Sequence, residues 1–75
     1  MYIIIEIQTN DNGSIGILTH VSDTWRGAQQ IYHEKLAYAA MSTLPRYAVV
    51  LMDSSGIVQE SRYYTTEPAP EPEEV

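Results

Sequence analysis

The sequence contains no cysteine, so neither a disulfide framework nor a zinc site built on thiolates can stabilise the fold. It also has no run of about 18 apolar residues, the length that a helix needs to cross a bilayer. The opening MYIIIEIQTN lacks the basic residues and the small-residue cleavage site of a signal peptide. We therefore expect a soluble, intracellular protein.

Basic residues are few, because four Lys and Arg stand against ten Asp and Glu. They are scattered singly, at Arg26, Lys35, Arg46 and Arg62, so no basic stripe is available to neutralise a phosphate backbone. The composition thus argues against duplex nucleic acid as a ligand.

Signatures of catalysis and metal binding are also missing. His20 and His33 fall on different predicted elements, and no carboxylate stands three or four residues from His33. The four glycines are isolated, so there is no glycine-rich phosphate loop. Ser54 and Ser55 lie in a predicted hairpin turn, with no base and acid to activate them. We expect a protein that is not an enzyme and that holds no metal or cofactor.

The residues that are present predict a fold of five elements. Two apolar strands flank the turn at Asn12-Gly13, a helix is capped by Ser22 or Asp23 and closed by Pro45, and a second hairpin turns at DSSG. The strands are expected at residues 2–7, 14–21, 46–52 and 57–64, with the helix at 25–45. The order ββαββ predicts an α+β fold, with a four-stranded, mainly antiparallel sheet and one helix packed on one face.

The apolar residues exceed what one helix and one sheet face can bury. Trp25, Ala28, Tyr32, Leu36 and Ala39 form the predicted stripe against the sheet. In the first and third strands, apolar residues lie on both faces. A sheet with one face exposed to water should instead carry polar residues at every second position.

A chain of 75 residues buries only about 60% of its unfolded surface, and assembly is the remaining means of stabilisation. We therefore predict a homo-oligomer. Ile31 and Tyr38, which fall beside the stripe, are the helix residues expected at the contact between subunits.

The C-terminal segment differs in composition from the rest. EPAPEPEEV, residues 67–75, alternates proline with acid and holds four of the ten acidic residues. We predict a single α+β domain over residues 1–66 and a disordered acidic tail over 67–75.

Six tyrosines and one tryptophan accompany no phenylalanine, so every aromatic side chain but one carries a hydroxyl. One interpretation is that these hydroxyls only reach solvent at the margin of the sheet. The other is that some line clefts between subunits, where a ring stacks on a base and an arginine binds a phosphate. On that second interpretation the predicted ligand-binding residues are Arg26, Tyr32, His33, Ser42, Arg46 and Tyr63.

Several stretches carry a resemblance. MYIIIEIQTN, the turn DNG, IYHEKLAYAAMS with a proline soon after, and AVVLMDSSGIVQESRYY resemble very short proteins encoded by phages and prophages of gut bacteria. The likeness covers residues 1 to about 64. It implies a phage protein acting in the host cytoplasm, and short accessory phage proteins are often countermeasures against host immunity.

Three functional hypotheses follow. By analogy with phage sponge proteins, the chain forms a small homo-oligomer that sequesters a nucleotide-derived immune signal, such as a cyclic or ADP-ribose-derived nucleotide, without cleaving it. Alternatively, it is an acidic inhibitor whose carboxylates imitate nucleic-acid phosphates and bind a host defence nuclease or effector. The third hypothesis is a structural phage component with no small ligand.

Overall fold

The computed structural model describes residues 1–65 as four strands and one helix. The elements are, in order, β1 (Tyr2–Thr9), β2 (Ile15–Ser22), α1 (Trp25–Met41), β3 (Arg46–Asp53) and β4 (Val58–Thr65). The sheet has the order β2-β1-β3-β4, and every neighbouring pair is antiparallel. The predicted ββαββ architecture is confirmed. The predicted disordered tail, residues 67–75, lies outside the described residues.

Both hairpin turns form where the sequence predicts them. Gly13 and Gly56 have φ angles of 90° and 87°, in the left-handed region that glycine occupies without a steric penalty. At the second turn the Asp53 carboxylate accepts hydrogen bonds from the backbone N–H groups of Ser55 and Ile57. These turns fix the register of the two hairpin pairs, β1–β2 and β3–β4.

The helix begins at Trp25, as the sequence suggested, but it ends at Met41, short of the expected end at 45, and its N-cap differs from the predicted one. Thr24, rather than Ser22 or Asp23, is the N-cap, and its hydroxyl accepts a hydrogen bond of 3.1 Å from the Gly27 N–H. Ser22 supports this cap, because its hydroxyl donates to the Thr24 carbonyl and accepts from the Thr24 N–H. The prediction of the cap was wrong because Ser22 is still paired within β2, opposite Tyr2.

Gly27 allows this cap to close. A Cβ atom at Gly27 would lie 2.5 Å from the Ser22 hydroxyl oxygen and 2.9 Å from that of Thr24. We expect Gly27→Ala to lower stability by about 1 kcal/mol through loss of the cap, although alanine is the better helix former. Thermal unfolding followed by circular dichroism measures this. Gly16→Ala is the control, because nothing lies within 4 Å of a Cβ there, and equal melting temperatures for the two variants would contradict the prediction.

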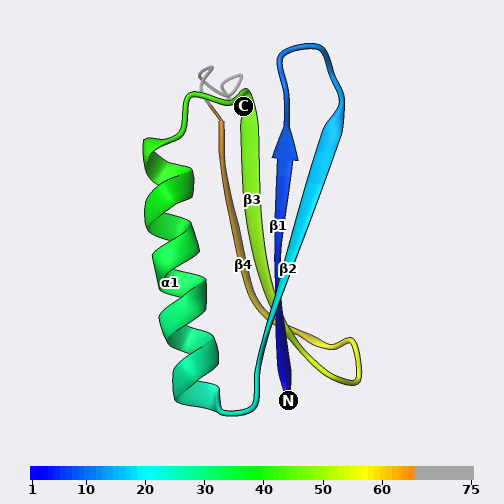
Figure 1. Cartoon of the computed structure of the whole chain (residues 1–75), viewed down its shortest axis with the longest axis vertical. Helices are drawn as coiled ribbons and strands as arrows, with labels where there is room; N and C mark the ends of the chain where they lie inside the picture. The colour runs from blue at the N-terminus through cyan, green and yellow to red at the C-terminus, as the bar shows by residue number, and fades with distance from the viewer. Residues whose placement is uncertain (66–75) are drawn as a thin grey trace, which may run out of the picture.

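The core lies between α1 and one face of the sheet (Figure 1). Ala28, Tyr32 and Ala39 of the predicted helical stripe are buried, and Leu36 packs against them. Ile31 also packs against this core, which removes it from the surface expected to mediate assembly, whereas Tyr38 is 52% exposed. The buried hydrophobic residues are Ile4, Ala28, Tyr32, Ala39, Tyr47, Val49 and Leu51.

The opposite face of the sheet, called the outer face below, is covered by no element within residues 1–65 (Figure 1). It consists of the alternate strand positions that point away from α1. Its apolar members are Ile3, Ile5, Ile7, Ile15, Ile17, Val21, Ala48, Val50, Met52, Val58 and Tyr63. The sequence-based expectation that both faces of the sheet are apolar is therefore confirmed for the central strands β1 and β3.

Within the described residues, no helix combines the length and the apolar character required to cross a membrane.

Candidate functional site

Three polar or aromatic side chains of β4 face the helix. The register pairs Glu60 with Leu51, Arg62 with Val49, and Tyr64 with Tyr47. Residues paired across a sheet point to the same face, and these β3 residues are buried under α1, so the β4 residues also point toward the helix. β4 is an edge strand, however, and lies at the margin of the helix rather than beneath its centre.

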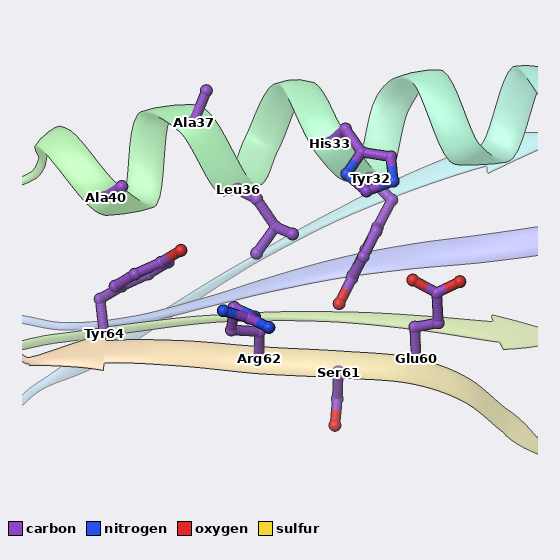
Figure 2. A pocket seen from close by; sticks show the side chains of 9 residues that line it. All are labelled: Tyr32, His33, Leu36, Ala37, Ala40, Glu60, Ser61, Arg62 and Tyr64. Atoms are coloured by element: carbon purple, nitrogen blue, oxygen red, sulfur yellow. The ribbon is translucent and has the colours of Figure 1, made fainter.

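A groove of about 540 Å³ therefore opens between α1 and β4 (Figure 2). This volume falls in the range of ligand sites. On the helix side, the groove is lined by Tyr32, Leu36 and Ala40. Their i, i+4, i+8 spacing places them on one face of α1. The lining residues are Tyr32, His33, Leu36, Ala37, Ala40, Glu60, Ser61, Arg62 and Tyr64.

Tyr32 joins the core to the groove. Its side chain is almost fully buried, while its hydroxyl reaches down toward β4 in Figure 2. Burial raises the pKa of Tyr32, the nearby Glu60 carboxylate raises it further, and the Arg62 charge opposes both. The hydroxyl therefore stays protonated near neutral pH and can both donate and accept a hydrogen bond.

The two charged residues of the groove differ in how they are held. Glu60 accepts a hydrogen bond of 2.9 Å from the Gln29 side chain. The guanidinium of Arg62 lies between Tyr64 and Tyr32 in Figure 2, and it forms no hydrogen bond or ion pair with any residue in the described part of the chain. Arg62 is thus the cation available to an incoming anion.

A second hollow, of about 450 Å³, continues the groove toward the C-terminal end of α1. The two share Ala40 and Tyr64, so the Tyr64 ring lies between them. Ser42 lines this second hollow, and its hydroxyl accepts a hydrogen bond from the Leu44 N–H directly after the helix. Together the two hollows form adjoining spaces on either side of Tyr64.

The structure brings together some of the residues predicted from sequence. Tyr32 and His33 line the groove, and Ser42 lines its continuation. Arg26 is exposed in the first turn of α1 and does not line the groove. Arg46 and Tyr63 lie on the outer face, where the guanidinium carbon is 5.4 Å from the centre of the Tyr63 ring.

Sequence reasoning missed Glu60, Arg62 and Tyr64 as a group. Their spacing of two residues was visible and places them on one face of a strand. The sequence did not show which face, because that depends on the pairing with β3, which shifts between Leu51 and Met52. Choosing Tyr63 instead of Tyr64 selected the opposite side of the sheet.

A polar cluster that sequence reasoning did not anticipate lies under the helix. Glu6 is 3% exposed, and its carboxylate accepts a hydrogen bond from the Tyr47 hydroxyl and lies 2.6 Å from His20 Nε2. Burial alone would raise the pKa of Glu6, but these two hydrogen bonds and the charges of His20 and Lys35 together lower it below its ordinary value. Glu6 is thus held as a buried carboxylate near neutral pH. The pKa of Tyr47 is raised by burial and by its hydrogen bond to Glu6.

Among residues 1–65, no three His, Asp or Glu side chains gather as a metal site would require. Comparison of the chain with protein-family models, curated proteins and solved structures finds no match. The site is therefore interpreted from its own geometry.

Proposed function

We propose that the protein binds a phosphate-bearing ligand of the nucleotide class in the α1–β4 groove and holds it without cleaving it. The observation that carries the proposal is the Arg62 guanidinium, which lies in the groove without an acidic partner in the described residues. A guanidinium binds phosphate through two parallel hydrogen bonds, and such charge-assisted contacts are the stronger ones.

The other lining residues suit the rest of such a ligand. Tyr64 offers a ring face on which a base can stack, and Leu36 offers apolar contact from the helix. Glu60 and the Tyr32 hydroxyl can accept hydrogen bonds from ribose hydroxyls or an exocyclic amine. These residues supply binding groups for each part of a nucleotide.

Retention without cleavage is favoured over catalysis by the same geometry. A serine hydroxyl is a common nucleophile, and Ser61 stands next to Arg62 in the sequence. Its side chain points away from the groove in Figure 2. His33 Nε2 is within 3.0 Å of the Gln29 side-chain oxygen rather than of a nucleophile. In a phage-encoded homo-oligomer, this binding would sequester a nucleotide-derived immune signal in the host cytoplasm, as sponge proteins do.

The acidic-inhibitor hypothesis has less support from the described residues. Four of the ten acids lie in residues 67–75, outside the described part of the chain. Neither that hypothesis nor a purely structural role makes specific use of the Arg62 guanidinium, which is exposed in the groove and has no acidic partner among residues 1–65. Binding of an anionic ligand does make use of it.

Calorimetry of the wild type against cyclic and ADP-ribose-derived nucleotides tests the proposal. We expect one class to bind stoichiometrically and to be recovered intact after denaturation. Arg62→Ala should weaken that binding by about ten- to a hundredfold, because it removes a charge-assisted contact worth about 1.5–3 kcal/mol.

Arg26→Ala is the matched control, since Arg26 is exposed and does not line the groove. Its affinity should equal that of the wild type. Failure of the folded wild type to bind any nucleotide, or equal losses in the two arginine variants, would refute this site.

A further inference from the structure

The outer face of the sheet is an apolar surface that no element within residues 1–65 covers. On the edge strand β2, Ile15, Ile17 and Val21 are 58%, 62% and 53% exposed. Isolated exposed apolar residues are common, but these lie next to Ile3 and Ile7 of β1 in one continuous sheet. An antiparallel sheet that faces water on one side normally carries polar residues at these positions.

We propose that the outer face is the interface of a homodimer in which two copies pack sheet against sheet, with their helices on the outside. Each copy then contributes one helix layer and one sheet layer to an assembly of four layers. The two apolar sheet faces form a further core, about 10 Å thick, between the copies. This assignment replaces the helix surface at Ile31 and Tyr38 as the expected contact, and it does not depend on the proposed ligand.

The size of the face fits a stable dimer. Four strands at about 4.8 Å spacing and eight residues at about 3.3 Å rise cover roughly 19 by 26 Å, or about 500 Å² of flat area. Side chains project from this plane, so the solvent-accessible area is larger than the flat area. It approaches the roughly 800 Å² per partner of a standard interface. A patch of this extent lies toward the upper end of what monomers expose, and such patches often mark interaction sites.

The chain also needs the burial that a second copy supplies. The core under α1 contains seven buried hydrophobic residues, two of which are alanines. Domains of this length are marginal without disulfides, metals or oligomerisation, and the sequence has no cysteine. Packing the outer faces together adds a third apolar layer to the two that the separate copies already hold.

The composition of the outer face favours a second copy over other occupants. Its only charged member is Arg46, at one end of β3, so two copies meet without burying charge at the centre. Residues 67–75 of the chain itself contain four glutamates and three prolines. Ala69 and Val75 alone do not supply enough apolar area to cover the sheet. A net charge of −6 opposes binding to an anionic membrane.

Analytical ultracentrifugation of the full chain tests the interface. We expect a wild-type dimer at low micromolar concentration, and Ile17→Glu should raise the dissociation constant by about a hundredfold or more. The reason is that a two-fold interface buries each substitution twice, without a partner for the carboxylate. Ile17 is exposed in the isolated subunit, so the fold should survive, as circular dichroism will show.

Tyr38→Glu is the matched control, because it introduces the same charge at an exposed position of the helix. It should remain dimeric. A wild type that is monomeric at about 100 μM, or a Tyr38→Glu monomer beside an Ile17→Glu dimer, would overturn the assignment.

Oxidation of methionine by peroxide tests the same interface in the wild-type protein. Met52 lies on the outer face, whereas Met41 is 78% exposed at the end of the helix. We expect Met52 to oxidise more slowly as protein concentration rises, while the rate at Met41 stays constant. Concentration-independent oxidation of Met52 across the range in which the protein associates would place the interface elsewhere.

Discussion

Leu51→Ala is expected to destabilise the fold by about 2–5 kcal/mol, enough to unfold much of the protein at room temperature. Leu51 is fully buried, and it is one of the three largest side chains in the core with no exposed surface. Truncation removes its transfer free energy and leaves a cavity that neighbours fill only in part. Domains of this size have only a few kcal/mol of net stability.

Thermal and urea unfolding at one fixed protein concentration measures the effect of Leu51→Ala, because assembly makes stability depend on concentration. The melting temperature should fall by about 10 °C or more. Leu18→Ala is the control, since it makes the same chemical change at a side chain that is 49% exposed. A loss at Leu18 as large as that at Leu51 would show that the core is not centred on β1 and β3.

Glu6→Gln is expected to cost about 1.5–3 kcal/mol at pH 7, because it replaces a charged hydrogen-bond acceptor by a neutral one of the same shape. The buried carboxylate accepts from Tyr47 and contacts His20, and the amide cannot make both interactions with equal strength. The loss should appear as a lower urea midpoint with an unchanged slope.

The effect of Glu6→Gln should depend on pH. The pKa of Glu6 in the fold lies below its ordinary value, so ionised Glu6 contributes stability above that value, and the contribution is lost as pH falls through the lowered pKa. Wild type and variant should therefore converge in stability as the pH falls through that lowered pKa. Glu34→Gln, at an exposed acid of α1, should show no such convergence. A difference between wild type and Glu6→Gln that is constant with pH would mean that Glu6 is not ionised in the fold.

The proposed ligand groove and the proposed dimer are compatible with each other. With the outer faces packed together, the α1–β4 groove of each copy stays on the outside, because it opens on the helix side of the sheet (Figure 2). A dimer then carries two independent grooves. We accordingly expect the Ile17→Glu variant to keep its nucleotide affinity even as it loses association.

Local signals in the sequence were sufficient for the elements themselves. The glycines at 13 and 56 and the cap region before Trp25 fix where the chain turns, and their effects act over a few residues. Pro45 excludes helix from the residues just before it, although α1 already ends at Met41. The β-branched and aromatic residues of YIIIEI and RYAVVLM, bounded by turn-forming residues, likewise predict strands. The order ββαββ follows directly from these signals.

Glu6 shows why the same local reasoning could not identify the polar part of the core. An acid in an apolar strand looks like an outward-facing residue when its neighbours are the only guide. Its partners Tyr47 and His20 stand 41 and 14 residues away in sequence, and only the strand register brings them together.

By itself, the sequence determined that the chain makes two hairpins around one helix and that it holds more apolar surface than one helix can cover. The tertiary structure alone decided that Arg62 and Tyr64, rather than Arg46 and Tyr63, face α1. It also decided that Ile31 packs against the core, whereas Ile17 on the outer sheet face stays exposed. The physical reason is that a strand's period of two assigns residues to alternate faces, while pairing with a distant strand determines which face is buried.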